Sequence, residues 1–300
     1  MTQRVVAIVG ATAVGKTELS IEAAQRLGAE IVSVDSMQIY RGMDVGTAKP
    51  DAAVLGAVPH HLVDVFDPSH DVTVAEFRDL ARDAIDDIGE RTVPLLVGGS
   101  GLYFRAVVDR LSIPPSSVQV RGRLESEVDT LGTESLHARL VELDPDAAAK
   151  IEPGNARRIV RALEVIEITG RRFSDNDGWD RYESVYDLVL VGLTRPRDDL
   201  YARIEARVDS MLAGGLVEET RRVAAAGMGR TARQALGYRQ ILDLEEAEPA
   251  AIRDAIVRAT KRFARRQESW FRSDPRVAWF DISEPGGAEA AIAHLEAGGR

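Results

Sequence analysis

The chain has 300 residues, 45% of them hydrophobic and 29% charged, and 38 Lys and Arg against 48 Asp and Glu give a formal net charge of −10. These proportions are typical of a globular protein with a buried core, and they exclude a chain that is disordered as a whole. The sequence contains no cysteine, which excludes disulfides, thiolate catalysis, iron–sulfur clusters and cysteine zinc sites.

Membrane signals are missing from the sequence. No apolar run reaches the roughly 18 residues of a membrane-spanning helix, and the N-terminal run, residues 5–9, is far too short. We therefore expect a soluble, cytoplasmic protein with no membrane contact. Taken over the whole chain, the negative charge argues against nucleic acid as a partner.

The first third of the chain alternates strand and helix signals. Residues 5–9, 31–34 and 93–97 are short apolar runs, as expected for strands buried on both faces. Residues 16–27 have apolar side chains at helical spacing before Gly28, and Thr73 with Glu76 fits a capping box that begins a second helix. Strands alternating with helices predict an α/β fold with a parallel, doubly wound sheet flanked by helices.

The pattern changes at residues 112–117, which have the composition of a linker. Beyond it the sequence predicts three helices, over residues 121–131, 134–143 and 156–168. A polar, turn-rich stretch follows at residues 171–182, and a strand at residues 187–193. We predict a core domain of residues 1–112 and 183–300 with a mostly helical insertion domain, residues 113–182. The tail predicts helices over residues 198–272, broken at 214–215 and 227–229, and we expect the Ala- and Gly-rich residues 288–300 to fray.

Residues 10–17 match the pattern G-x-x-x-x-G-K-[ST] between a predicted strand and a predicted helix. Its glycines let backbone N–H groups turn toward an anion, and the helix N-terminus adds positive potential. The pattern is that of ATP- and nucleotide-binding P-loops, yet it specifies only a polyphosphate. The expected binding residues, with Lys16 as the mobile charge and Thr17 as the Mg²⁺ ligand, are Gly10, Ala11, Thr12, Ala13, Val14, Gly15, Lys16 and Thr17.

An acidic residue follows the second predicted strand. Asp35 is expected at the carboxyl edge of the sheet, where open α/β sheets bind ligands. It is interpreted as a general base near the phosphate loop, or as an N-cap or turn carboxylate, with Ser36 and Gln38 beside it. The third strand lacks the Asp of ordinary P-loop ATPases, since it ends in Gly98-Gly99-Ser100-Gly101.

Longer strings are more specific than the loop. They read VDSMQIYRGMDVGTAKP at 34–50, PHHLVD at 59–64, VGGSGLY at 97–103, RALEV at 161–165, GYRQ at 237–240 and RRQESWF at 265–271. In this order they resemble the tRNA isopentenyltransferase family over residues 5–280. The resemblance implies that the loop binds the diphosphate of dimethylallyl diphosphate, and that the acceptor is the exocyclic amine of the adenosine 3′ of the tRNA anticodon. The insertion would be the mobile domain that closes over the anticodon stem-loop.

The resemblance also assigns catalytic roles. Asp35 would be the general base and Ser100 its hydrogen-bonding partner, while Arg221 would help Lys16 and a Mg²⁺ ion at Thr17 to neutralise the diphosphate. Two positions depart from the family pattern: Ala11 stands where Pro is usual, and Ser100 where Thr is usual. Ser100 keeps the hydroxyl but gains a rotamer.

The resemblance further implies a set of tRNA contacts. Taken alone, each basic cluster fits a solvated helix face equally well, and Trp270 fits a core position better than base stacking. Three segments, 154–172, 221–240 and 253–272, hold 17 Lys and Arg against 4 Asp and Glu, so the net charge averages a local basic footprint with an acidic body. The expected contacts are Asp35, Ser36, Met37, Gln38, Ser100, Arg121, Arg157, Arg158, Arg161, Arg233, Gln234, Tyr238, Arg265, Arg266, Gln267 and Trp270.

We therefore expect a monomeric, Mg²⁺-dependent enzyme whose partners are tRNA and dimethylallyl diphosphate. Three alternatives share the phosphate loop. They are an isopentenyltransferase that acts on free adenine nucleotides, a P-loop small-molecule kinase, and a nucleotide-switched RNA-binding module without catalysis. His60 and His61 lack a third ligand at helical spacing and are interpreted as structural or substrate-loop histidines, not as metal ligands.

Overall fold

The protein is described by a computed structural model that covers residues 2–175 and 181–298. It divides into two compact units: unit 1 is Met1–Asp109 with Ser184–Arg300, and unit 2 is Arg110–Glu183. The sequence placed these boundaries at 112/113 and 182/183. Of the helices in the described part of the chain, none has both the length and the apolar character of a membrane span.

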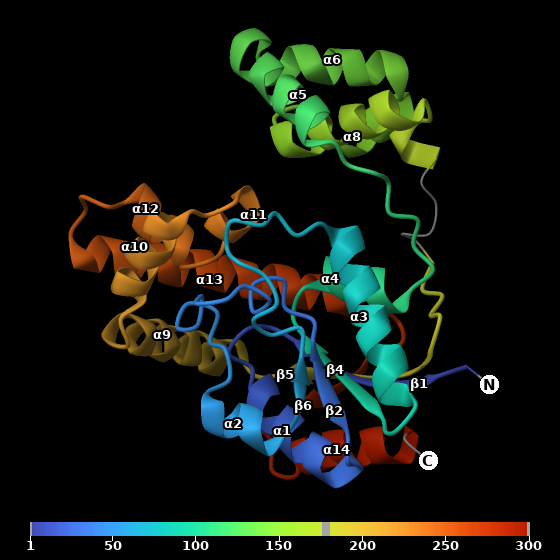
Figure 1. The fold of residues 1–300 in the computed structure, drawn as a ribbon, viewed down its shortest axis with the longest axis vertical. Helices are drawn as coiled ribbons and strands as arrows, with labels where there is room; N and C mark the ends of the chain where they lie inside the picture. The colour runs from blue at the N-terminus through green and yellow to red at the C-terminus, as the bar shows by residue number, and fades with distance from the viewer. Residues whose placement is uncertain (1, 176–180, 299–300) are drawn as a thin grey trace. The chain divides into compact units, whose positions relative to one another are not determined.

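Unit 1 is built on a parallel sheet, which confirms the α/β class predicted from the sequence (Figure 1). Each hydrogen-bonded pair of strands is parallel, so β1, β2 and β4 all end at one edge. The phosphate loop follows β1, Asp35 follows β2, and Ser100 follows β4, as parallel topology requires. Among the described residues the strand order is β3-β2-β4-β1-β5-β6, with bounds β1 (Arg4–Gly10), β2 (Glu30–Ser33), β3 (His60–His61), β4 (Pro94–Gly98), β5 (Asp187–Thr194) and β6 (Ala278–Asp281).

Both faces of the sheet are covered by helices. In β1, Val5, Ala7 and Val9 belong to one hydrophobic cluster, whereas Val6 and Ile8 belong to another, as the two-residue period of a strand dictates. The first cluster contains α3 (Val74–Gly89) and α4 (Gly101–Val108), and the second contains α1 (Lys16–Leu27) and α14 (Gly287–Gly298). β1 is therefore buried on both sides, and the loop at its end has a rigid base.

Local signals explain the helices beside the site. The Thr73 side chain accepts a hydrogen bond from the Glu76 N–H at 3.1 Å and begins α3, as predicted. Gly28 ends α1 in the left-handed conformation at φ 62°. The expectation that the C-terminal stretch frays was wrong for α14, whose Ala291, Ile292 and Leu295 are fully buried. Residues 299 and 300 lie outside the described residues.

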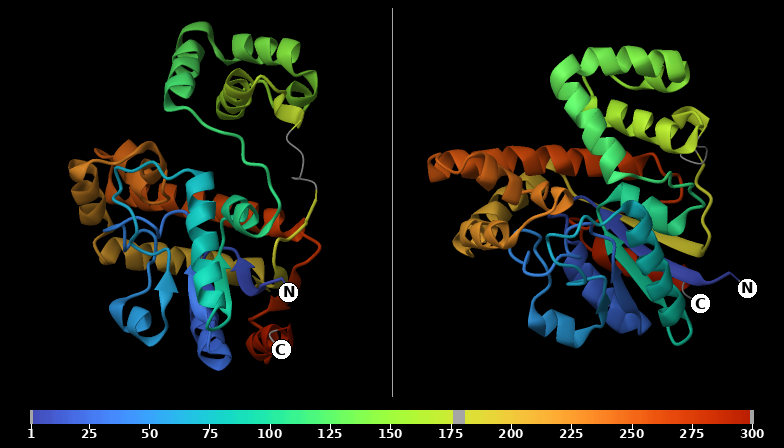
Figure 2. Two further views of the ribbon diagram at one scale, coloured as in Figure 1. Left: turned by 45° about the vertical axis from the view of Figure 1, so that its right-hand side comes forward. Right: turned by 45° about the horizontal axis from the view of Figure 1, so that its top comes forward.

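The remaining helices of unit 1 follow β2 and β5. Breaks fall at Gly215 (φ 90°) and Gly227 (φ 104°), near the predicted positions. The long helix α13 packs along α9 and reaches β1 and α4, and Figure 2 shows it from two sides. The bounds are α2 (Ala52–Ala57), α9 (Arg197–Ala213), α10 (Leu216–Ala226), α11 (Arg230–Arg233), α12 (Tyr238–Asp243) and α13 (Pro249–Arg272).

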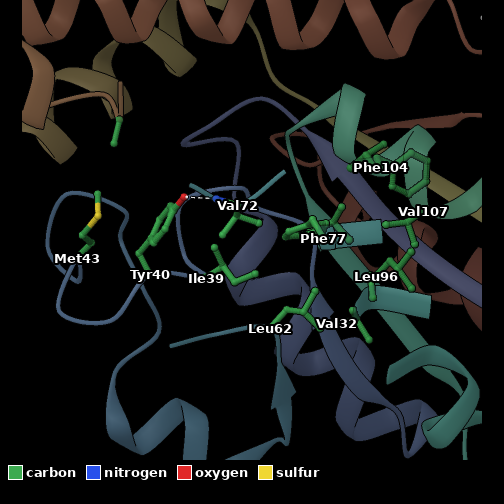
Figure 3. Packing of buried hydrophobic residues seen from close by; sticks show 14 of the residues in the cluster. Val32, Ile39, Tyr40, Met43, Leu62, Val72, Phe77, Leu96, Phe104 and Val107 are labelled. Carbon is green, nitrogen blue, oxygen red and sulfur yellow. Dashed lines mark hydrogen bonds between the residues drawn. The ribbon is translucent and has the colours of Figure 1, made fainter. Parts of the chain in front are cut away.

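The segment after Asp35 is anchored in the core. Ile39, Tyr40 and Met43 are fully buried in the same cluster as Phe77 (Figure 3). The Tyr40 hydroxyl accepts a hydrogen bond from the Val72 N–H at 3.4 Å. Asp35 therefore begins a stretch that is held by packing, which limits how far its carboxylate can move.

Unit 2 is helical and has its own small core, in which Leu124, Leu136, Leu140, Ile159 and Leu163 are buried. The three helices predicted here are present within three residues of their expected ends, whereas the short α7 was missed. Of the turn-rich residues 171–182, residues 176–180 lie outside the described residues. The bounds are α5 (Val118–Leu131), α6 (Thr133–Leu143), α7 (Pro145–Lys150), α8 (Ala156–Thr169) and the 3₁₀ helix η1 (Phe173–Asp175).

Candidate active site

The phosphate loop has the backbone geometry of an anion cradle. Gly10 has φ 151°, and a Cβ there would lie 2.8 Å from the Leu193 carbonyl oxygen, so only glycine fits. Gly15 adopts φ 114° and caps α1, whose first N–H groups have no acceptor inside the helix. Together these features place unsatisfied N–H donors at the positive end of a helix.

Long cationic side chains donate hydrogen bonds to the carbonyl oxygens of the loop. Lys16 Nζ donates to the carbonyls of Gly10 (3.0 Å) and Ala11 (2.8 Å). Arg203 Nε donates to the Ala13 carbonyl at 2.9 Å, and Arg195 Nε donates to the Val14 carbonyl at 2.7 Å. These bonds hold the loop from its carbonyl side and leave the helix N-terminus for a ligand.

The loop has an excess of positive charge. Burial and repulsion from Arg207 lower the pKa of Lys16 to about 8, although Asp35 and Glu18 act to raise it. Burial and repulsion from Arg203 likewise lower the pKa of Arg207, against the same two carboxylates. The neighbouring carboxylates thus do not offset the cost of these cations, and an anion would relieve it.

Sequence reasoning missed Arg195, Arg203 and Arg207. A signal existed: Arg203 and Arg207 are one turn apart on a helix that follows β5, the strand beside β1. Arg221, which the sequence proposed instead, is exposed on α10, and no contact among the described residues connects it with the loop.

A pocket opens beside the loop. The structure brings Asp35 and Gln38 together with Lys16 and Thr17 in its lining, which consists of Lys16, Thr17, Ser20, Ile31, Ser33, Asp35, Gln38, Pro50, His60, Val97 and Gly98. Asp35 also accepts a hydrogen bond from the Met37 N–H at 2.9 Å, as the turn interpretation expects, while its role as a base stays a prediction. Ser36 and Met37 are half-buried next to it.

The two histidines of β3 have different surroundings. His61 Nε2 lies 2.7 Å from a Glu30 carboxylate oxygen, while His60 lines the pocket and its Nδ1 lies 2.7 Å from the Val58 carbonyl oxygen. A hydrogen bond from Arg91 is the main cause that lowers the pKa of Glu30 to about 2. No group of three His, Asp or Glu side chains in the described residues could hold a metal ion.

The glycines around Ser100 are required by close contacts. A Cβ on Gly98 would lie 2.4 Å from the Val34 carbonyl oxygen, and one on Gly99 would lie 2.3 Å from Gln267 Nε2. A Cβ on Gly101 would lie 2.1 Å from the Trp270 ring. Ser100 itself is half-buried before α4, and its hydroxyl does not cap that helix.

A buried carboxylate anchors the segment that precedes Pro50, a residue of the pocket lining. Glu219 accepts hydrogen bonds from the N–H groups of Asp44, Val45 and Gly46 at 3.0 to 3.1 Å and from the Tyr238 hydroxyl at 2.5 Å. These bonds fix the segment that leads to Pro50 in the pocket. Sequence reasoning missed Glu219, which had no local signal.

Comparison with known proteins decides the family. A model described as IPP transferase matches residues 38–274, well over half of the chain, and a model described as isopentenyl transferase matches residues 3–63. The chain belongs to the IPP transferase family.

Relatives of this chain match more than nine tenths of its length. tRNA dimethylallyltransferase of Streptomyces coelicolor is 53% identical over 286 residues, covering 92% of this chain and 89% of that protein. Its counterpart in Acidothermus cellulolyticus is 49% identical over 300 residues, covering 98% and 94%. The crystal structure of a tRNA isopentenylpyrophosphate transferase from Bacillus halodurans is 41% identical with a TM-score of 0.71, covering 99% of this chain and 98% of that one.

Two of the expected RNA contacts of this IPP transferase family member are buried. Tyr238 has no exposed surface, and burial and its hydrogen bond to Glu219 raise the pKa of its hydroxyl. Gln267 is 6% exposed and bonds Thr12 and Gly99. Direct contact with RNA therefore does not fit either side chain, and this corrects the expectation from the sequence. Gln38 is half-buried. Its amide oxygen accepts a hydrogen bond from the Ser33 hydroxyl, and its amide nitrogen donates to the carbonyls of Thr47 and Ala48.

Two further expected contacts pair inside unit 2. Arg121 and Arg161 both donate at 2.7 Å to Glu164, whose side chain has no exposed surface. Arg161 also donates to the carbonyls of Pro114 and Pro115. Both arginines are thus paired with a carboxylate inside unit 2.

The other expected contacts are accessible. Trp270 on α13 is 37% exposed, so its ring is neither fully buried in the core nor fully free for base stacking. Gln234 accepts a hydrogen bond from Arg239 at 3.3 Å. The exposed side chains are Arg157 and Arg158 on α8, Arg233 and Gln234 at α11, and Arg265 and Arg266 on α13.

Proposed function

We propose that this chain transfers the dimethylallyl group of dimethylallyl diphosphate to the exocyclic amine of the adenosine on the 3′ side of a tRNA anticodon. The observation that carries this proposal is a cation-rich phosphate loop with a carboxylate in the same pocket. The names of the relatives, tRNA dimethylallyltransferases at about half identity over most of the chain, support it.

The loop side of the pocket would bind the leaving group. When the bond between the allylic carbon and the diphosphate oxygen breaks, negative charge accumulates on the diphosphate. The N–H groups at the start of α1, Lys16 and Arg207 would stabilise that charge, because they are in place before the reaction. We propose Arg207 for this role in place of Arg221, because Arg207 lies one turn from Arg203, which bonds the loop, whereas Arg221 is exposed on α10.

The other side of the pocket would handle the acceptor. The amine nitrogen forms a new bond to the allylic carbon and must lose one proton, which we assign to the Asp35 carboxylate. Ser100 would orient the amine through its hydroxyl. The adenosine must leave the anticodon-loop stack to enter the pocket.

A Mg²⁺ ion fits the donors of this pocket. Thr17, Ser33 and Asp35 supply hard oxygen atoms, which Mg²⁺ prefers, but they are too few to form a complete cage. Such an ion would be held by Thr17 together with diphosphate oxygens and water, and it would neutralise charge on the diphosphate.

The exposed arginines would supply the tRNA footprint. Arg265 and Arg266 on α13 and Arg157 and Arg158 on α8 are exposed, as phosphate contacts require. Trp270 offers part of its ring for stacking.

The test uses labelled dimethylallyl diphosphate with Mg²⁺ and either unmodified tRNA or free AMP. Label in tRNA supports the proposal. Label in AMP alone supports the free-nucleotide isopentenyltransferase, and label in neither would overturn the prenyl transfer and leave the kinase or the RNA-binding switch.

The same assay tests the base. Asp35→Ala should reduce kcat roughly 10²–10⁴-fold with tRNA affinity retained, because a general base contributes about that much. Asp67→Asn, at a side chain that is 72% exposed, serves as the control and should stay within twofold of wild type. Prenyl transfer by Asp35→Ala within a few-fold of wild type would rule out the assignment.

A further inference from the structure

One buried side chain connects the two loops that carry the two halves of the proposed reaction. Gln267 Oε1 accepts a hydrogen bond from the Thr12 N–H at 2.9 Å, and Gln267 Nε2 donates to the Gly99 carbonyl oxygen at 2.9 Å. Thr12 belongs to the phosphate loop, and Gly99 immediately precedes Ser100. The amide therefore bridges the loop proposed to bind the diphosphate and the residue before Ser100, which is proposed to orient the acceptor.

The partners fix the orientation of this amide. A flipped side chain would place its NH₂ group against the Thr12 N–H and its oxygen against the Gly99 carbonyl, which loses both hydrogen bonds. Gln267 is only 6% exposed, so water does not replace a lost partner at low cost. The bridge thus has one orientation in which both the oxygen and the nitrogen of the amide have a partner.

The packing leaves little freedom in the distance between the loops. A Cβ on Gly99 would lie 2.3 Å from Gln267 Nε2 and 3.0 Å from the Gly10 carbonyl oxygen. The backbone after β4 is therefore in close contact with both the end of β1 and Gln267. A shift of one loop would break a hydrogen bond to the other.

The same helix has a different outer face. Arg265 and Arg266, which directly precede Gln267, are exposed. Figure 1 shows α13 crossing above the strands of unit 1, and Gln267 reaches the ends of β1 and β4 from it. α13 therefore presents cations to solvent and one amide to the pocket loops.

We propose that Gln267 is a positioning residue that sets the distance between the diphosphate loop and Ser100, and that it acts without touching tRNA. This inference rests on the proposed prenyl transfer. A positioning error of about 1 Å can reduce a rate on the order of 10²-fold. Loss of the bridge should therefore lower kcat and weaken binding of the diphosphate, while tRNA binding is retained.

The experiment compares Gln267→Ala and the near-isosteric Gln267→Met with Gln25→Ala, an exposed glutamine on α1. We expect both Gln267 variants to lose roughly tenfold or more in kcat, with KM for tRNA within twofold. Inorganic pyrophosphate should bind them several-fold more weakly in calorimetry. Gln25→Ala should match wild type in all three measurements. A rise in the KM for tRNA with unchanged kcat and pyrophosphate affinity would overturn the inference.

A double-mutant cycle keeps the test decisive if one variant folds poorly. Gly99→Ala pushes on the same amide from the other end, so Gly99→Ala with Gln267→Ala should cost much less in kcat than the two changes added. Additive effects would contradict a shared bridge. If wild type transfers no prenyl group to tRNA, the proposed function fails; pyrophosphate affinity then decides on Gln267, because weaker binding by Gln267→Met supports the bridge and equal binding refutes it.

Discussion

The phosphate loop in unit 1 and the Glu164 cluster in unit 2 both bring cationic side chains together, but only the Glu164 cluster neutralises their charge. At the loop, burial and repulsion from Arg207 lower the pKa of Lys16 to about 8. In unit 2, burial acts to raise the pKa of Glu164, but hydrogen bonds from Arg121 and Arg161 lower it overall. The phosphate loop thus keeps its positive charge available for a ligand, whereas in unit 2 the carboxylate of Glu164 neutralises it.

The difference shows why a count of charges along the sequence is a weak guide to binding. Arg157 and Arg161 lie one helical turn apart on α8, but Arg157 is exposed while Arg161 bonds Glu164 and two carbonyls. The cations available to a ligand are those that the fold leaves without a matching carboxylate. The four predictions below test this distinction, from the largest expected effect to the smallest.

Removing the carboxylate from unit 2 should have the largest effect. Glu164→Ala would leave Arg121 and Arg161 without their partner and the Ser117 N–H without its acceptor. Breaking a buried pair costs about 3–5 kcal/mol, and we expect about 3 kcal/mol because the two arginine side chains are 34% and 27% exposed. Hydrogen exchange of α5 and α8 measures this loss.

The pH dependence has a definite sign. Because the folded-state pKa of Glu164 is lowered, its contribution to stability is present above the ordinary glutamate pKa and is lost as the pH falls below it. Glu164→Gln should therefore flatten the acid side of the stability profile of unit 2. An unchanged profile would show that the cluster contributes nothing to stability.

At the phosphate loop, anion affinity should fall with rising pH. Lys16 is charged below its pKa of about 8 and neutral above it, so the dissociation constant of pyrophosphate should rise by up to about tenfold per pH unit above pH 8. Lys16→Arg stays charged throughout and corrects for titration of pyrophosphate itself. Parallel curves for wild type and Lys16→Arg between pH 7 and 10 would contradict a lowered pKa.

Exposed and paired arginines should differ in their effect on salt dependence. Arg265→Ala or Arg266→Ala should each reduce the slope of log affinity for tRNA against log salt by roughly 0.7–1, the effect of losing one proposed phosphate contact. Arg161→Ala should lower the stability of unit 2 and leave the slope unchanged. Equal reductions from Arg161→Ala and Arg265→Ala would remove the distinction between paired and available cations.

The sequence predicted those parts of the molecule whose signals are local. The phosphate loop, the Thr73 cap of α3 and the Gly28 end of α1 depend on residues within a few positions of one another. β6 was missed because its residues are all half-buried and show no alternation, and they become a strand only by pairing with β5. α14 looked mobile by composition, but the sheet buries one of its faces.

The candidate site divides in the same way. Lys16, Thr17 and Asp35 could be predicted, because each follows a strand in a parallel sheet and the carboxyl ends meet. Arg207 and Gln267 depend on helices far along the chain that the fold brings to that edge. Tyr238 was expected to contact RNA from the family resemblance, and no local feature of the sequence shows that its hydroxyl bonds Glu219.

The glycines at 98, 99 and 101 have a consequence for how this enzyme can be varied. Each of them is in contact with another segment, so a library over residues 98–101 should tolerate substitutions best at Ser100. Ser100 is also the residue proposed to face the acceptor amine. The position where sequence variation is tolerated best is thus the one where it would change selectivity. Ser100 is therefore the first residue to vary when engineering the acceptor preference.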